Sequence, residues 1–305
     1  MKRLSIIIVT YNSEGDIYEC IASIREHADI PWNELEIIVV DNNSKDADSM
    51  FARIRELYGE DIILIKNVCN GGYGQGNNVG IRRATSPLIL IMNPDVRMME
   101  PILKQTVEEF EKDAGLAMYG MKQMISATEC SPFSFCCAYS LNGYLYTILS
   151  SICNRFNWYI AKYMHFSGAC FFIRKDMFVS AGLFDETIFM YGQEEDIHFR
   201  MWQHGYRKLV YNPNMHYIHL IEKRAPSLKY EIKLLDVAII LGKKKGISAY
   251  RMLKNRLENN TMLIWRERVK GVLGKRNDER ISVLLELRKE IKRKMAQTSP
   301  ASNCH

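Results

Sequence analysis

Two carboxylates in this chain follow short apolar runs that are typical of buried strands. Asp41 comes directly after the run from Leu35 to Val40, and Asp95 comes three residues after the run from Ile89 to Met92. In open α/β sheets, ligands bind outside the carboxyl ends of the strands, so both side chains are expected at the rim of a sheet. A carboxylate in this place can bind a metal ion, or accept hydrogen bonds from a ribose or a base N–H. Asp95 is therefore a candidate metal ligand, and Asp41 a candidate nucleoside ligand.

Each of these carboxylates also has a structural interpretation. Asp41 could cap a helix or an Asx turn. Asp95 could cap the helix that follows, although the residues from Met98 to Pro101 come before any plausible helix start. Pro94 fixes its own φ angle and turns the chain immediately before Asp95, which favours the ligand role.

A glycine-rich segment, Asn70 to Gly80, lies between a predicted strand and a predicted helix, and holds five glycines. Glycines let backbone amides approach a ligand closely, as the diphosphate of a nucleotide requires. The segment does not match the G-x-x-x-x-G-K-[ST] pattern, and no acidic residue follows at the spacing of dinucleotide-binding sites. These departures disfavour an ATPase and a Rossmann dehydrogenase.

The elements that must position these residues alternate between strand and helix. Strands are predicted at Leu4 to Val9, Leu35 to Val40 and Ile62 to Ile65, and helices after the caps at Asn12 or Ser13 and from Ala47 to Tyr58. Alternation of this kind predicts a mostly parallel, doubly wound α/β sheet.

Four motifs together resemble glycosyltransferase family 2, and within it the bacterial rhamnosyltransferase-like branch. They match the family in order and spacing between residues 4 and 220, and they are Val9 to Ser13, Val40 to Ser44, Asn70 to Gly80 and Asn93 to Asp95. The resemblance implies the A-type glycosyltransferase fold, with one nucleotide-binding α/β sheet and an acceptor-binding half.

The resemblance also implies roles for single residues. Asp41 would bind the nucleoside, Asp95 would be the last carboxylate of the D-x-D metal motif, and His219 would lie near the metal and the diphosphate. Asn93 replaces the first Asp of that motif, which implies a site with one carboxylate and with sugar or ribose contacts from Asn93. A lone histidine such as His219 can equally be structural. The implied metal is Mg²⁺ or Mn²⁺, and further donor contacts are expected from Thr10, Tyr11, Asn12, Asn70, Gly71, Gly72, Tyr73 and Asn77.

The segment from Gly182 to Arg200 resembles the catalytic segment of the family. Counting back from Arg200, Glu194 falls on the general-base position and Asp196 on the following acidic position. Glu195 falls between them and stays an alternative, because the frame could slip by one residue. Inverting transfer needs such a base, since the acceptor hydroxyl loses its proton as it attacks. The structural alternative is that these carboxylates stabilise a helix start through the helix dipole.

Charge is distributed unevenly along the chain, although the net charge is only +6. The segment from Lys243 to Met295 holds 17 Lys and Arg against 6 Asp and Glu, a net charge of +11, and the remaining residues carry −5. A basic segment of this kind can bind nucleic acid, bind the anionic face of a membrane, or form a solvated helical face. No nucleic-acid-binding motif accompanies it, so nucleic acid is not an expected partner.

The predicted domain organisation is a catalytic domain followed by a helical extension. We expect the nucleotide-sugar-binding half at residues 1–100, the acceptor-binding half at 101–225, and a basic helical extension at 226–305. The aromatic-rich segment from Met121 to Lys162 could face the acceptor, touch lipid, or form an ordinary buried hairpin or helix. In the extension, the sequence predicts a disordered tail from Thr298 and three helices, at Ser227 to Leu241, Ile247 to Trp265 and Glu279 to Met295.

The location of the protein is predicted from what its sequence lacks. No signal-peptide pattern follows Lys2 and Arg3, and no run of eighteen apolar residues occurs. We therefore expect a cytoplasmic protein, peripherally associated with the inner face of the cell membrane. The eight cysteines form no C-x-x-C pair, and we expect them to be reduced thiols.

The resemblance implies an inverting, metal-dependent glycosyltransferase. The donor would be dTDP-rhamnose, and the acceptor a lipid-linked oligosaccharide of a bacterial surface polysaccharide, such as an O-antigen or capsule. A UDP-hexose or a UDP-N-acetylhexosamine is the alternative donor. A non-catalytic protein that binds nucleotide sugar or nucleic acid is the alternative of a different class.

Overall fold

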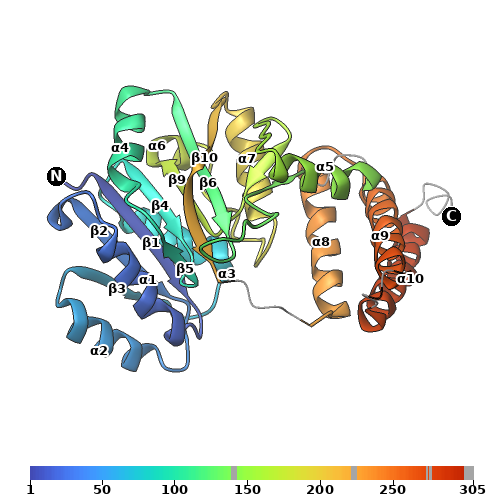
Figure 1. Ribbon diagram of the computed structural model, residues 1–305, viewed down its shortest axis with the longest axis horizontal. Coiled ribbons are helices and arrows are strands. Elements are labelled where there is room, and N and C mark those ends of the chain that lie inside the picture. The colour runs from blue at the N-terminus through green and yellow to red at the C-terminus, as the bar shows by residue number, and fades with distance from the viewer. Residues whose placement is uncertain (139–142, 221–224, 273, 275–276, 299–305) are drawn as a thin grey trace. The chain divides into compact units, whose positions relative to one another are not determined.

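An eight-stranded sheet forms the centre of the larger part of the protein (Figure 1). The computed structural model describes residues 1–138, 143–220, 225–272, 274 and 277–298. The strand order is β3-β2-β1-β4-β9-β6-β10-β5, and all strands are parallel except β9 and β5. The strands are β1 (Leu4–Thr10), β2 (Leu35–Asp41), β3 (Ile62–Lys66), β4 (Leu88–Met92), β5 (Val96–Met98), β6 (Leu116–Met124), β9 (Cys170–Arg174) and β10 (Lys208–His219).

Helices cover both faces of this sheet, because its central strands are apolar on both sides. Every residue of β2 and β4 is buried. One core contains residues of α1 (Glu14–Glu26), α2 (Ala47–Tyr58) and α4 (Leu103–Lys112), and the other contains residues of α3 (Gly72–Arg83), α6 (Lys175–Ser180) and α7 (Gln193–Gln203). This arrangement confirms the predicted mostly parallel α/β sheet. A separate two-stranded sheet pairs β7 (Phe135–Cys137) with β8 (Met164–Phe166).

Helix α3 begins inside the glycine-rich segment and not after it. Gly71 is its N-cap residue, and the helix already includes Gly72. A Cβ atom on Gly76 would overlap the side chain of Val9, and a Cβ atom on Gly80 would overlap that of Ile7. These two glycines lie one turn apart and face β1, so they let the helix pack closely on the sheet. Close packing thus explains Gly76 and Gly80, whereas the sequence suggested that these glycines let a ligand approach the backbone.

The chain divides into two compact units. The first comprises Met1–Cys136 and Tyr159–Ile221, and the second comprises Cys137–Trp158 and Glu222–His305. The expected domain bounds stay a prediction. Of the residues expected in an acceptor-binding half, Cys137–Trp158 fall in the second unit, with the C-terminal helices. The expected tail, apart from Thr298, lies outside the described residues. All cysteines in the described part of the chain are free thiols.

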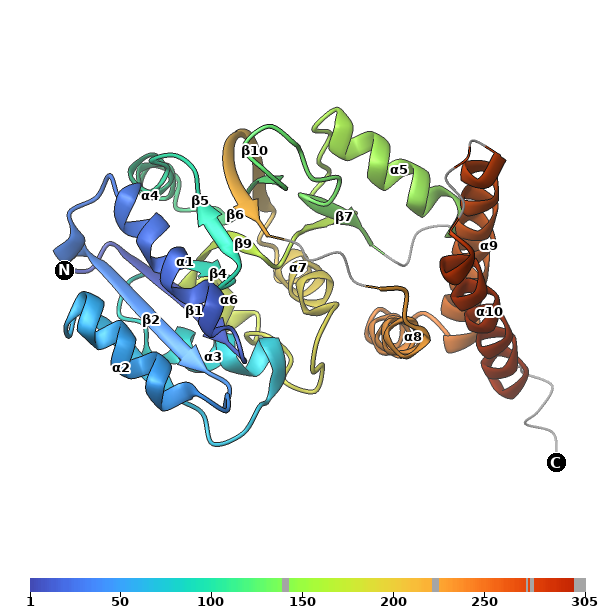
Figure 2. The same cartoon turned by 60° about the horizontal axis from the view of Figure 1, so that its bottom comes forward.

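The second unit is a set of helices packed around α9, which confirms the predicted helical extension (Figure 2). Leu235, Leu253, Leu287 and Ile291 form its small core. Within the described residues, no helix is both long enough and apolar enough to span a membrane. The helices are α5 (Gly143–Arg155), α8 (Leu228–Lys244), α9 (Ala249–Val272) and α10 (Asp278–Thr298).

Candidate functional site

Strand register brings the predicted site residues to one edge of the sheet. Thr10 at the end of β1 lies beside Asp41 at the end of β2. Met92 at the end of β4 pairs with Cys170, so the residues just before β9 lie at the same edge. The end of β10 joins them, because His219 pairs with Val96. Residues from four separate parts of the chain therefore lie along the edge where ligands bind in α/β sheets.

Asp41 is completely buried, and its carboxylate accepts three hydrogen bonds from the protein. Thr10 Oγ1 donates to Oδ1 at 3.0 Å, and Ser44 Oγ donates to the same oxygen at 2.5 Å. The backbone N–H of Ser44 donates to Oδ2 at 2.8 Å. These bonds support the structural interpretation of Asp41 as a turn-stabilising carboxylate, and its contact with a nucleoside stays a prediction.

The loop after β1 carries Tyr11 and Asn12 to the same edge. Tyr11 is half exposed, and Asn12 has a φ angle of 51°. The N–H of Asn12 donates to Ser44 Oγ at 2.8 Å, and its Oδ1 accepts from the N–H of Lys45 at 3.3 Å. The loops after β1 and after β2 border a cavity of about 220 Å³. It is lined by Asn12, Ser13, Glu14, Gly15, Ser44, Asp46 and Met50.

The backbone amides at the start of α3 already have hydrogen-bond partners. The N–H of Gly72 donates to Asn70 Oδ1 at 2.9 Å, and the N–H of Tyr73 donates to the carbonyl of Phe189 at 3.1 Å. Asn77 Nδ2 donates to the carbonyl of Tyr73, while Asn77 Oδ1 is buried without a partner among the described residues. These amides would have to exchange partners to bind a diphosphate, so their role in donor binding stays a prediction.

Asp95 and His219, the two predicted metal ligands, lie side by side. His219 Nε2 is 3.2 Å from Asp95 Oδ2, and the N–H of Leu220 donates to the carbonyl of Asp95 at 2.9 Å. Asp95 caps no helix, because β5 follows it directly and α4 begins only at Leu103. His216 is not part of this pair, since its ring and backbone N–H contact Glu100.

The geometry of the Asp95–His219 pair fits one Mg²⁺ or Mn²⁺ ion. Mg²⁺ binds its ligands at about 2.0–2.1 Å in octahedral geometry, so neighbouring ligand atoms lie about 3 Å apart. The observed 3.2 Å separation is close to this value. In the described part of the chain, no group of three or more His, Cys, Asp and Glu side chains could hold a metal. The remaining ligands would be diphosphate oxygens and water, as is common for Mg²⁺.

Glu194, the predicted general base, lies against the segment that precedes β9. A Cβ atom on Gly168 would overlap the Glu194 carboxylate, so a larger residue there would displace this side chain. Burial raises the pKa of Glu194, because desolvation disfavours the charged form, and the nearby Glu195 acts in the same direction. A raised pKa suits a carboxylate that must accept a proton near neutral pH.

Two hydrogen bonds tie the segment beside Glu194 to the chain just before Asp95 and to α3. The N–H of Asn93, two residues before Asp95, donates to the carbonyl of Ala169 at 2.8 Å. Tyr73 Oη donates to the carbonyl of Gly168 at 2.7 Å. Desolvation raises the pKa of Tyr73 well above its usual value, so the phenol stays a donor. Asn93 and Tyr73 are thus both held to the segment of residues 168–169, against which Glu194 lies.

The neighbours of Glu194 have mainly structural contacts. Asp196 is buried, and Arg200 donates to its Oδ2 through Nε at 2.9 Å and through Nη2 at 2.7 Å. The same guanidinium also binds the carbonyls of Ala181 and Leu183, so it joins α7 to the preceding turn. These bonds position the start of α7, and a catalytic role for Asp196 stays a prediction.

Glu195, the alternative base, is buried, and its Oε2 lies 4.0 Å from His165 Nε2. His198 accepts a hydrogen bond from the N–H of Phe166 and contacts the carbonyl of Glu194. Desolvation lowers the pKa of His198 to about 3, so this ring stays neutral. Together these residues fix α7 against β8.

Sequence reasoning did not identify Gly168 or Asn78 as residues that shape the site. Asn78 exchanges hydrogen bonds with the backbone of Phe184 and donates to Glu186, so it holds the turn before α7. Gly168 leaves room for the carboxylate of Glu194, a residue 26 positions later. The sequence contains no local signal for either contact, because both depend on the approach of distant segments.

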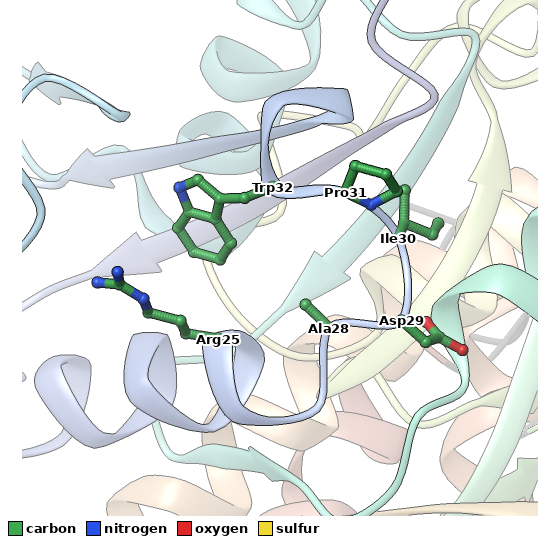
Figure 3. Close-up of a pocket in the computed structure, with 6 residues that line it drawn as sticks. All are labelled: Arg25, Ala28, Asp29, Ile30, Pro31 and Trp32. Atoms are coloured by element: carbon green, nitrogen blue, oxygen red, sulfur yellow. The ribbon is translucent and has the colours of Figure 1, made fainter.

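A depression of about 600 Å³ lies at the other edge of the sheet (Figure 3). It lies where α1 ends and β2 begins, next to the Arg25 guanidinium, which is 5.7 Å from the Trp32 ring centroid. None of the predicted site residues lines it, so it is not the candidate active site. Its lining residues are Arg25, Ala28, Asp29, Ile30, Pro31 and Trp32.

Comparison with protein families gives a match to part of the chain, the part that holds β1 to β6. Residues 5–128 match the family described as Glycosyl transferase family 2. Over 207 residues the chain is 27% identical to the low-salt glycan biosynthesis hexosyltransferase Agl10 of Haloferax volcanii, and the match covers 66% of this chain and 62% of that protein. Over 119 residues it is 30% identical to the poly(ribitol-phosphate) beta-N-acetylglucosaminyltransferase TarS of Staphylococcus aureus, covering 37% and 20%. The chain thus spans less than two thirds of the length of these relatives.

Solved structures with the same fold cover nearly the whole chain. The mannosyltransferase PcManGT of Pyrobaculum calidifontis, in complex with GDP-Man and Mn²⁺, aligns over 97% of this chain and 84% of its own, with a TM-score of 0.60 and 18% identity. S. aureus TarS 1–349 in complex with UDP aligns over 95% and 92%, with a TM-score of 0.54 and 17% identity. At such identities the likeness establishes the A-type fold alone. Neither the two relatives nor these two structures carry a rhamnosyltransferase name, so the expected branch gains no support from them.

Proposed function

We propose that this chain, which carries a glycosyltransferase family 2 domain over residues 5–128, transfers a sugar from a nucleotide diphosphate to an acceptor hydroxyl with inversion. The observation that carries the proposal is that a candidate metal-binding pair and a desolvated carboxylate lie at the same edge of the sheet. Asp95 and His219 form the pair, and Glu194 is the carboxylate. A protein that only binds nucleotide sugars has no need of this carboxylate.

The donor would bind across the ends of β1, β2 and β4. Thr10, Tyr11, Asn12 and Asp41 would hold the nucleoside, since they share the edge that ligands use in such sheets. Asp95 and His219 would hold Mg²⁺ or Mn²⁺, which would supply positive charge against the leaving diphosphate. Asn93 and the start of α3, from Asn70 to Asn77, would contact the ribose, the sugar or the phosphates.

Proton transfer falls to Glu194. As the acceptor oxygen attacks the anomeric carbon from the face opposite the diphosphate, its proton passes to the Glu194 carboxylate. The bond between the anomeric carbon and the diphosphate breaks, and the nucleotide leaves with its electron pair. Gly168 leaves room for the carboxylate, while the Asp196–Arg200 pair positions the helix that carries it.

The donor sugar is a hexose or an N-acetylhexosamine in our proposal, with dTDP-rhamnose as the alternative suggested by the motif resemblance. The first choice is supported by the names of the relatives, a hexosyltransferase and an N-acetylglucosaminyltransferase. One of the structures with this fold holds GDP-Man with Mn²⁺, and another holds UDP.

The acceptor is a lipid-linked oligosaccharide of a surface polysaccharide, and the protein works at the inner face of the cell membrane. Support for this part of the proposal comes from the basic C-terminal segment, which can bind an anionic membrane surface.

The decisive experiment is a panel of UDP-, GDP- and dTDP-sugars, each tested with Mn²⁺ for thermal stabilisation of the protein. A ligand that binds the native state raises its apparent stability. The sugar that stabilises should also be transferred to an acceptor by the wild type. Stabilisation without transfer or hydrolysis would favour a binding protein, and the absence of any stabilisation would contradict the proposed function.

A further inference from the structure

Helix α5 turns an apolar face outward. Ile148, Leu149 and Ile152 are 44%, 37% and 40% exposed. Phe156 continues the same face, because its N–H still donates to the carbonyl of Ile152, and it is 55% exposed. At 3.6 residues per turn these four side chains fall within an arc of about 100°.

The opposite face of α5, which carries two polar residues, is buried. Ser150, Cys153 and Asn154 are each less than one tenth exposed, and α5 packs on α9. A surface helix usually buries its apolar stripe and exposes its polar face. Here the apolar stripe is the more exposed face, so a large part of its surface is open to solvent.

Two aromatic rings extend this surface beyond the end of the helix. Phe156 and Trp158 stack with their ring centroids 5.1 Å apart, and Trp158 is 60% exposed. Tryptophan favours the boundary between water and lipid, because its ring is amphipathic. Ile148, Leu149, Ile152, Phe156 and Trp158 are called the α5 surface below.

The charge of the second unit indicates what covers the α5 surface. This unit holds 22 Lys and Arg against 9 Asp and Glu, a net charge of +13, whereas the first unit carries −7. A second copy of so basic a unit would be repelled, while an anionic lipid surface would be attracted. An apolar stripe with aromatic residues in a basic unit is the composition of an interfacial membrane-binding helix.

We propose that the α5 surface inserts into the interface of an anionic lipid membrane. Electrostatic attraction brings the basic unit to the lipid head groups, and burial of the α5 side chains then holds it there. This deepens the proposed function, because it names the surface that would bring the enzyme to a lipid-linked acceptor. Vesicles without any substrate test it, so its failure is distinct from a failure of the transfer reaction.

The test uses the full chain and a matched pair of variants. Ile152→Glu and Ile240→Glu introduce the same charge at side chains of nearly equal exposure, 40% and 39%, in the same unit. Co-sedimentation is measured with vesicles of phosphatidylcholine and phosphatidylglycerol. Ile152→Glu should weaken partitioning about tenfold or more, because an apolar side chain is no longer buried. Ile240→Glu should bind nearly as the wild type does.

Trp158 provides a second readout on the wild type. Its fluorescence should shift to the blue with these vesicles, and a Trp158→Phe variant should lose that part of the shift while it still sediments. Equal binding by Ile152→Glu and Ile240→Glu would overturn the proposal, since electrostatics alone would then explain adhesion. A dimer in light scattering that Ile152→Glu dissociates would also overturn it, because a second copy would be the occupant. Thermal unfolding checks that both Glu variants fold.

Discussion

At the scale of single residues, the candidate site depends on one carboxylate whose proton affinity is raised by burial. Glu194 lies against Gly168, in a place where its charged form is poorly solvated. The same burial that prepares it for proton transfer also costs stability when it is ionised. Three predictions concern this residue and the Asp95–His219 pair, the candidate metal ligands.

Glu194→Gln should lower kcat by about 10²- to 10⁴-fold, the usual contribution of a general base. Donor affinity measured by calorimetry should stay unchanged, because the base faces the acceptor. Glu195→Gln is the control, and its effect on kcat should be mild. If Glu195→Gln is the inactive variant and Glu194→Gln is active, the base is Glu195.

The pH dependence of activity should report the raised pKa of Glu194. The base works when it is deprotonated, so kcat/KM should fall as pH decreases through the folded-state pKa, at a higher pH than an ordinary Glu near 4.3 would give. The stability of the folded protein should change in the opposite direction: kcat/KM rises with pH, whereas the contribution of Glu194 to stability falls. A raised folded-state pKa lowers stability above that pKa, so Glu194→Gln should unfold at the same or a higher temperature than the wild type at neutral pH. A wild-type rate that is flat down to pH 4 would contradict the assignment.

Asp95→Asn should lose most of the activity and require about tenfold or more Mn²⁺ for what remains, because a carboxylate ligand has been replaced by an amide. Chelation with EDTA should abolish transfer by the wild type. The variant should unfold near the wild-type temperature, since a partly exposed ion pair contributes about 0–1 kcal/mol. Full activity in EDTA would leave the Asp95–His219 pair as a structural contact.

At the scale of elements, α3 and α7 are held in place by close contacts that admit little change. Helix α3 packs on β1 through glycines, and Asn78 of the same helix binds the turn that leads to α7. Arg200 joins α7 to that turn from the other side. The proposed base and the candidate donor-binding edge are therefore positioned by one connected set of elements.

Gly80→Ala should destabilise the protein by about 1–3 kcal/mol, the usual cost of overpacking a core. The added methyl group would overlap Ile7 in a completely buried layer, and the helix would have to move away from β1. Chemical denaturation with urea measures the loss. Gly15→Ala, in an exposed turn of α1 with open space around it, is the control and should not destabilise.

At the scale of the whole molecule, charge divides between the two units. The first carries −7 and the second +13. The unit with the candidate site is thus the acidic one, and the attraction to anionic lipid that we propose would come from the helical unit. This separation lets membrane binding be measured independently of catalysis.

Binding of the full chain to anionic vesicles should fall as salt rises, because each Lys or Arg near the surface contributes about 1 kcal/mol at moderate ionic strength. Neutral phosphatidylcholine vesicles should bind much less at low salt. Equal binding to both kinds of vesicle at every salt concentration would show that charge has no part in the interaction.

The sequence by itself determined the class of fold and the identity of the main candidates. Apolar runs that end in Asp41 and Asp95 are local patterns, and the spacing back from Arg200 needs no knowledge of the fold. Helix periodicity likewise located the three C-terminal helices. Local patterns of this kind survive folding, because period and turn chemistry are set by neighbouring residues.

Only the tertiary structure decided which residues meet and why some are present. His219 lies beside Asp95 through the pairing of β10 with β5, and Gly168 is needed because Glu194 approaches it from another element. The sequence does not distinguish a glycine that lets a ligand approach from one that lets a helix pack closely. In the structure, Gly80 packs against Ile7. The outward face of α5 was equally hidden, since a pattern of apolar residues shows that a helix has two faces but not which of them the rest of the chain covers.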